Sequence, residues 1–237
     1  MTRKRKISMA IVSVLLSALL LTSGVMVYRD LSSRQKEKED FDILAELVEM
    51  PVTNPPITSE PPPAETAEPS ETTEPEEPLR DLWPLFEQNS ECIGWLCIPD
   101  TAVNYPVMHT PRNPQKYLRM NFYGEYSQSG VPFLDYRCSL DSGNLLIYGH
   151  NMKNGTMFGE LKNYTDSSFC ADHPTIEFQT ADDLFCYTVS EVKITDTSNK
   201  WYEDIGSELF EDKRRLVLST CYGGGSGRLL IIATEVD

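Results

Sequence analysis

Three residues of this chain have types and positions suited to nucleophilic catalysis, and two of them lie close together. Cys221 follows an apolar run, and a glycine-rich turn over 223–227 separates it from Arg228. This pattern predicts a strand that ends at the cysteine, a tight turn, and a strand that begins at the arginine. A thiolate is the nucleophilic form of cysteine, and a nearby cation favours it. Arginine can instead donate hydrogen bonds to a developing oxyanion. A buried cysteine beside a loop, with Arg228 as a surface charge, is the alternative interpretation.

The third residue is His150, which follows the apolar run 144–149 and is also expected at the end of a strand. Histidine is the side chain best suited to proton transfer near neutral pH. A hydrogen-bonded structural histidine is the alternative, but the presence of Cys221 favours a catalytic pair. The other two histidines, His109 and His173, lie in proline-flanked loops and are expected to be structural or solvent-facing. The histidines and cysteines lack the spacing of zinc ligands, so we predict no metal and no cofactor.

Short apolar runs separated by turn residues predict the elements that position these side chains. We expect strands at 94–98, 103–107, 144–148, 185–194, 216–220 and 229–236. We expect helical pieces at 82–86, after a cap at Asp81, and at 156–164 and 207–212. Many short strands with a few inserted helices predict a mainly β fold, either a largely antiparallel barrel or a sandwich.

The N-terminal segment predicts a membrane anchor. Residues 1–6 form a basic tip, and the uncharged, mostly apolar run 7–28 is long enough to span a bilayer. The cations should remain on the cytoplasmic side, which places the rest of the chain outside the cell. A cleavable signal peptide is the competing interpretation, with a loose match to a cleavage site near Gly24.

The segments between the anchor and the folded domain differ sharply in composition. Residues 29–50 are charged and contain apolar residues at helical spacing, which indicates a short juxtamembrane helix. Residues 51–78 are rich in proline and glutamate and contain no lysine or arginine. Such a segment cannot bury enough apolar surface to offset its ordering entropy, so we expect a disordered, extended stalk. Residues 79–237 are then the catalytic domain.

Charge and cysteine content exclude some classes of protein. The formal net charge is −15, and no basic stripe exists outside the N-terminal tip, which argues against nucleic acid as a partner. Six cysteines are present, but the folded part is large enough to bury a core without disulfides. We expect most of the cysteines other than Cys221 to be buried thiols.

The residues around these positions resemble one family. Segment 148–152 together with 155–158 is similar to the catalytic-histidine segment of class B sortases. Segment 218–221 resembles their cysteine segment, and 228–229 resembles the start of their arginine strand. Further matches upstream extend the resemblance, in the family's order, over nearly all of 81–237; they lie at 93–95, 104–107, 117–118 and 133–135.

The resemblance implies an eight-stranded sortase barrel with a few inserted helices, working at the outer face of a Gram-positive cell membrane. It implies that Cys221 attacks the threonine carbonyl of a C-terminal sorting motif in secreted proteins and forms a thioacyl enzyme. His150 would protonate the leaving amine, and Arg228 would hold the oxyanion. An amine of a peptidoglycan precursor of the lipid II type would then resolve the intermediate. Ser219 and Thr220 are the residues we expect to contact the substrate.

Two features depart from the class B pattern. The interval between His150 and Cys221 is short, so the helix expected at 207–212 is interpreted as reduced. The turn 222–227 contains no carboxylate, which leaves open whether an acidic residue orients His150. Two other functions remain open at this point: a pilin-polymerising sortase and a catalytically idle surface-binding module. Retention of Cys221, His150 and Arg228 together argues against the idle module.

Overall fold

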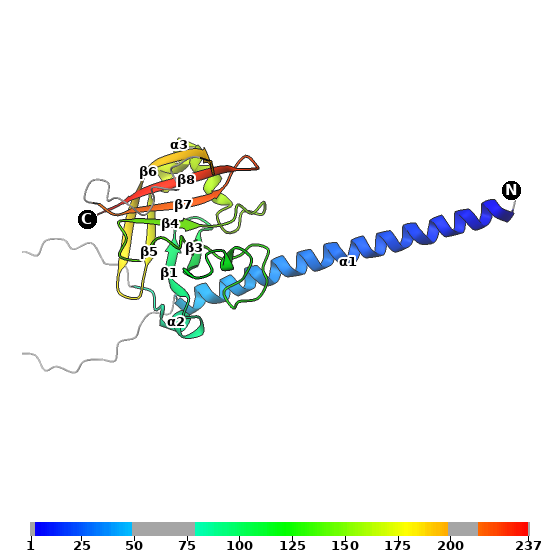
Figure 1. Cartoon of the computed structure of the whole chain (residues 1–237), viewed down its shortest axis with the longest axis horizontal. Helices are drawn as coiled ribbons and strands as arrows, with labels where there is room; N and C mark the ends of the chain where they lie inside the picture. The colour runs from blue at the N-terminus through cyan, green and yellow to red at the C-terminus, as the bar shows by residue number, and fades with distance from the viewer. Residues whose placement is uncertain (1–2, 49–78, 199–212, 237) are drawn as a thin grey trace, which may run out of the picture. The chain divides into compact units, whose positions relative to one another are not determined.

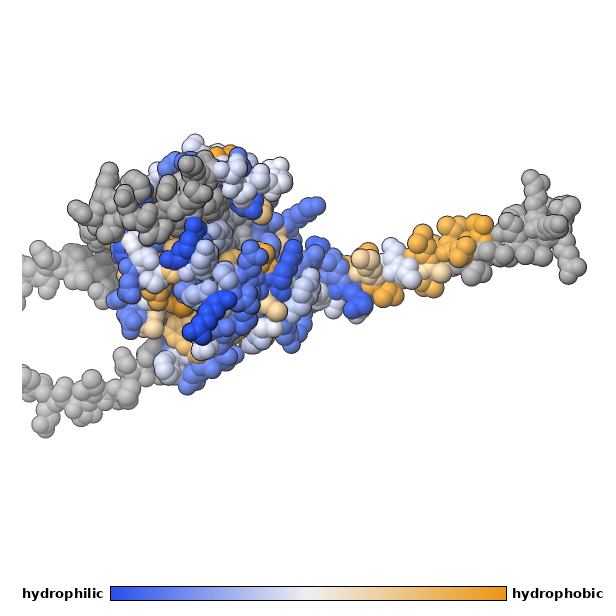
Figure 2. Space-filling model, viewed as in Figure 1, coloured by the Kyte–Doolittle hydropathy of each residue, from blue (hydrophilic) through white to orange (hydrophobic). Residues whose placement is uncertain are grey.

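The computed structural model describes residues 3–48, 79–198 and 213–236. Contacts divide the chain into two compact units, at 1–43 and 44–237. Helix α1 (Arg3–Val48) has 46 residues, about 70 Å at 1.5 Å per residue. By length and composition it is apolar enough to cross a membrane over part of Leu15–Val48, and Figure 2 shows apolar side chains along it. Because α1 continues through residue 28 without a break, the juxtamembrane helix expected within 29–50 is not a separate element.

The second unit contains a closed β-barrel of eight strands (Figure 1). Around the barrel the order is β1-β2-β3-β4-β7-β8-β6-β5. The β2–β3 and β4–β7 pairs are parallel, and the other neighbouring pairs are antiparallel. The strands are β1 (Cys92–Cys97), β2 (Asn104–Met108), β3 (Phe133–Leu134), β4 (Asn144–Tyr148), β5 (Thr175–Gln179), β6 (Leu184–Asp196), β7 (Arg215–Cys221) and β8 (Gly227–Glu235). The expected eight-stranded barrel is therefore confirmed.

Short helical segments precede or connect these strands. Helix α2 (Trp83–Gln88) comes before β1, η1 (Lys116–Leu118) lies between β2 and β3, and η2 (Glu160–Thr165) and α3 (Ser167–Asp172) lie between β4 and β5. Helix α2 begins at Trp83, one residue later than predicted. The Asp81 carboxylate accepts a hydrogen bond from the Trp83 backbone N–H at 3.0 Å. The helix expected at 156–164 begins later than predicted: residues 156–159 form a turn, and the helical part is η2, which starts at Glu160. The helix expected at 207–212 lies outside the described residues.

The barrel interior is built from apolar side chains of neighbouring strands. Leu96, Val107, Ile147, Leu218 and Ile231 are completely buried and come from five different strands. Each such side chain removed from water contributes about 1.5–3 kcal/mol. The barrel is therefore held together by its core, and all six cysteines are free thiols. Of the five other than Cys221, three are buried, as predicted for most of them, and Cys170 and Cys186 are half-buried.

Candidate active site

The parallel pairing of β4 with β7 brings His150 and Cys221 together. Tyr148 pairs with Ser219 at the end of this ladder, and the Gly149 backbone N–H continues it by donating to Ser219 O at 3.1 Å. Strands that run in the same direction have their carboxyl ends at the same edge of the sheet. His150 and Cys221, which lie 71 positions apart in the sequence, are therefore delivered to one edge of the barrel.

The β7–β8 hairpin places Arg228 directly opposite Cys221. The two residues form a cross-strand pair in the antiparallel register, in which facing Cβ atoms lie about 4.5–5.5 Å apart. The intervening turn requires glycine, because Gly223, Gly224 and Gly225 all have positive φ angles between 60° and 82°. The Arg228 guanidinium donates to Gly227 O through Nη1 at 2.8 Å, which helps to fix its orientation. The predicted hairpin, with thiol and guanidinium on adjacent strands, is confirmed.

A backbone carbonyl group orients the His150 ring. Nε2 lies 2.9 Å from Leu118 O. Because a carbonyl oxygen only accepts, Nε2 must carry the hydrogen, which leaves Nδ1 as the ring atom that can gain or lose a proton. Burial lowers the pKa of His150, the hydrogen bond to Leu118 opposes this, and the nearby charge of Arg119 lowers the pKa further. In the described residues, the partner of His150 is thus a peptide carbonyl rather than a carboxylate.

Hydrogen bonds from side chains to backbone carbonyls hold the histidine segment against the cysteine strand. The Thr220 hydroxyl donates to Gly149 O at 2.8 Å, and the Asn151 side-chain amide donates to Cys221 O at 2.8 Å. Gly149 itself has no room for a side chain, since a Cβ there would lie 2.5 Å from the buried Phe158 ring. These contacts explain physically why glycine and asparagine flank His150.

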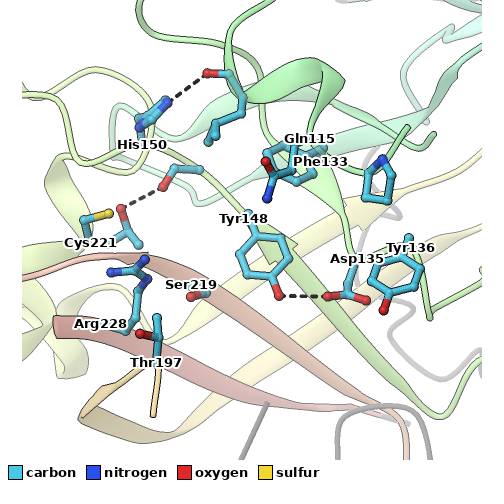
Figure 3. Close-up of a pocket in the computed structure, with 14 residues that line it drawn as sticks. Gln115, Phe133, Asp135, Tyr136, Tyr148, His150, Thr197, Ser219, Cys221 and Arg228 are labelled. Atoms are coloured by element: carbon cyan, nitrogen blue, oxygen red, sulfur yellow. Dashed lines mark hydrogen bonds between the residues drawn. The ribbon is translucent and has the colours of Figure 1, made fainter. Parts of the chain in front are cut away.

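A pocket of about 350 Å³ extends from these residues (Figure 3). Cys221, His150, Arg228, Ser219 and Thr220 all line it, so the structure brings together every site residue predicted from the sequence. Cys221 is exposed, whereas Ser219 and Thr220 are almost completely buried. In the view of Figure 3, His150 and Arg228 lie on opposite sides of the Cys221 thiol. A carbonyl group bound beside the thiol could meet a proton donor on one side and a guanidinium on the other.

The other end of the pocket carries a polar network that the sequence did not indicate. The Tyr148 hydroxyl donates to Asp135 Oδ2 at 2.7 Å, and Arg137 donates to both carboxylate oxygens of Asp135 at 2.8 and 3.0 Å. Burial raises the pKa of Asp135, but the hydrogen bonds from Arg137 and Tyr148 outweigh it and hold the pKa below its usual value. Asp135 is therefore a buried anion that holds the Tyr148 ring in the pocket wall.

The remaining candidate groups do not line this pocket. His109 hydrogen-bonds to the backbone of Asp135 behind the pocket wall. The His173 ring packs against Phe169 with ring centroids 4.3 Å apart and a tilt of 45°, which suits the structural role predicted for it. Cys92 is buried, and burial raises the pKa of its thiol to about 12. Within the described part of the chain, no cluster of three or more histidine, cysteine or acidic side chains could hold a metal ion.

Several residues of the site carry no signal of their own in the sequence. The Leu118 carbonyl, the Asn151 amide and the Asp135 carboxylate are brought to the pocket by strand pairing and loop packing. All three residues fall within segments that resemble class B sortases. No local pattern, however, indicated which group of each residue would be used.

Sequence comparison places this fold and this site in a known family. The sortase domain matches residues 96–236, which include Cys221, His150 and Arg228, and the chain belongs to the sortase family. Sortase B of Listeria monocytogenes is 39% identical over 127 residues, which are 52% of this chain and 49% of that protein. Sortase B of Staphylococcus aureus is 30% identical over 150 residues, 58% of this chain and 61% of that protein. The matched regions span about half to three-fifths of these relatives.

Solved structures of class B sortases have the same fold. Sortase B from B. anthracis in complex with AAEK1 has a TM-score of 0.64 and 25% identity, over 87% of this chain and 99% of that one. The S. aureus sortase B–substrate complex has a TM-score of 0.56 and 25% identity, over 65% and 83% of the two chains. The resemblance to class B sortases is thus confirmed by both sequence and structure.

Proposed function

We propose that this chain is a cysteine transpeptidase that cleaves a C-terminal sorting motif in secreted proteins and joins the product to an amine of a cell-wall precursor. The observation that carries the proposal is the pairing of Cys221 with Arg228 across the hairpin, in a pocket that His150 also lines. Cys221 is exposed there, as a nucleophile must be. Membership of the sortase family supports the same chemistry.

The residues divide the reaction between them. The Cys221 thiolate attacks the carbonyl carbon of the scissile peptide bond, a C–S bond forms, and the carbonyl electron pair moves to oxygen. Arg228 donates hydrogen bonds to that oxyanion. When the intermediate collapses, the C–N bond breaks and the leaving amine takes a proton from Nδ1 of His150. An acceptor amine then attacks the thioester, His150 takes its proton, and the Cys221 sulfur departs as thiolate.

The proposal includes the setting of the reaction. The basic residues that precede the apolar part of α1 favour a cytoplasmic N-terminus. The catalytic domain then faces outward on a single-pass anchor, where secreted proteins and peptidoglycan precursors of the lipid II type are accessible. Ser219 and Thr220 line the pocket and are proposed to contact the substrate strand. Since the Thr220 hydroxyl already donates to Gly149, its contribution would be an acceptor or packing contact.

Mass spectrometry tests this proposal directly. The full chain in mild detergent is incubated with a panel of sorting-motif peptides and then with a small amine acceptor. We expect a mass increase on Cys221 equal to the acyl fragment, followed by release of an amine-linked product. The Cys221→Ala variant should show neither species. Acylation at another residue, or peptide turnover by Cys221→Ala, would refute the assignment.

A further inference from the structure

The Leu118 carbonyl that orients His150 lies in a very short element. Leu118 ends η1, a 3-10 segment of three residues, and so short a helix is not stable on its own. With three residues, η1 makes a single 3-10 turn and gains little stability from its own hydrogen bonds. Something outside η1 must therefore fix the carbonyl in place.

Glu91 provides that attachment from a rigid position. It directly precedes β1, its backbone N–H bonds to the Asn89 side chain at 3.0 Å, and its carbonyl accepts from the His109 backbone N–H at 2.8 Å. Its carboxylate oxygen Oε2 accepts from Lys116 Nζ and from the Tyr117 hydroxyl, both at 2.5 Å. One carboxylate thus holds two consecutive residues of η1.

The contacts around Tyr117 continue to Leu118. Tyr117 is buried, its hydroxyl also accepts from Asn89 Nδ2 at 2.9 Å, and its backbone carbonyl accepts from Val131 at 3.1 Å. Burial and the Glu91 carboxylate raise the pKa of Tyr117, so its hydroxyl stays a donor. Behind the turn, a Cβ at Gly130 would lie only 2.9 Å from Leu118 O. The Leu118 carbonyl therefore has Gly130 packed closely against it, and the residue before it, Tyr117, is held by hydrogen bonds.

We propose that Glu91, through Lys116 and Tyr117, is the positioning residue that keeps the Leu118 carbonyl in line with Nε2 of His150. Glu91 itself does not line the pocket. It acts through η1 and takes the place of the acidic partner that a histidine base often has beside it. This inference rests on the proposed role of His150 in proton transfer.

The pKa of His150 is the quantity that tests this proposal, because it depends on the hydrogen bond to Leu118. The Leu118 hydrogen bond favours protonated His150, whereas burial and Arg119 disfavour it. If η1 is released, the bond to Leu118 weakens, and the pKa of His150 must fall further below its usual value. If the Glu91 contacts only stabilised the fold and did not position His150, the substitutions would leave this pKa unchanged.

The experiment compares Glu91→Gln and Tyr117→Phe in the full chain, kept in mild detergent. Histidine is isotopically labelled, and the imidazole signals are followed by NMR as the pH is varied. The chain has only three histidines, so the signals can be assigned by substitution, with His173 as an internal reference. We expect a lower His150 midpoint in both variants and a fall in kcat/KM of about tenfold, the effect of weakening one hydrogen bond.

Glu177→Gln is the matched control, because Glu177 forms a similar ion pair with Arg80 at 3.4 Å and does not line the pocket. It should lower thermal stability without moving the His150 midpoint. An unchanged midpoint in folded Glu91→Gln and Tyr117→Phe would overturn the proposal. So would a changed midpoint with kcat/KM at the wild-type value. The midpoint is measured without turnover, so a failure of the proposed catalysis would be detected separately, by full activity in His150→Ala.

Discussion

Replacing Arg228 by lysine separates the charge of the guanidinium from its geometry. In the structure Arg228 faces Cys221 across the hairpin, and its Nη1 is already bonded to Gly227 O at 2.8 Å. Arginine has five N–H donors in one plane, so the remaining four keep a fixed direction. Lysine keeps the positive charge near the thiol but carries all its donors on a single, freely rotating nitrogen.

The expected cost follows from this count of donors. A lysine that bonds to Gly227 O can offer the oxyanion a poorly aligned donor at best. Loss of one oxyanion donor typically lowers the rate about 10²–10³-fold, or roughly 3–4 kcal/mol of transition-state stabilisation. We expect a decrease of that order in kcat/KM for Arg228→Lys. Alkylation of Cys221 by a small thiol reagent should stay near the wild-type rate, because the charge that favours the thiolate is retained.

The assay measures peptide cleavage and alkylation on the same preparations. Arg215→Lys is the control, because Arg215 lies at the other end of the same strand pair, opposite Thr234. Because Arg215 does not line the pocket, kcat/KM of this control should stay within about threefold of wild type. Nearly full activity of Arg228→Lys would show that Arg228 acts through charge alone. A collapse of alkylation together with cleavage would show that its main role is to activate the thiol.

Three further predictions concern the nucleophile, the polar network and the anchor. Cys221→Ala should abolish cleavage in the peptide assay, whereas Cys186→Ala should retain most of it. Because the pKa of Asp135 is lowered by folding, its contribution to stability is present above about pH 4 and is lost as the pH falls towards the folded-state pKa. Asp135→Asn should therefore lower the free energy of unfolding by on the order of 2 kcal/mol near neutral pH and make it less dependent on pH. Denaturant titration between pH 3 and 7 measures both effects. An unchanged denaturant midpoint at pH 7 would contradict the stabilising role of the Asp135 network. In cell fractionation the chain should remain with membranes, and release of a mature form that begins after Gly24 would refute the uncleaved anchor.

Local patterns in the sequence were sufficient to predict the catalytic hairpin. A run of apolar residues, a glycine-rich turn and a second apolar run predict two antiparallel strands that could bring Cys221 and Arg228 together. The register that makes them a cross-strand pair comes from the structure. The end of β4 at Tyr148 was likewise predicted from an apolar run. Strand β3 was missed because it has only two residues, whereas β5 (Thr175–Gln179) alternates polar and apolar residues, so a strand signal was present there that the predicted set of strands lacked.

Other features were decided only when the barrel closed. Nothing in the sequence around His150 indicates that β4 pairs in parallel with β7, yet this pairing brings His150 and Cys221 to one edge of the barrel. The His150 ring bonds to Leu118 O, which is a backbone atom. Because every residue has a backbone carbonyl, no residue type in the sequence could indicate this partner. The types and positions of Cys221, His150 and Arg228 indicated nucleophilic catalysis, and the resemblance of the segments around them to class B sortases indicated the class of protein. The orientation of His150 depends on contacts between distant segments, which only the folded chain specifies.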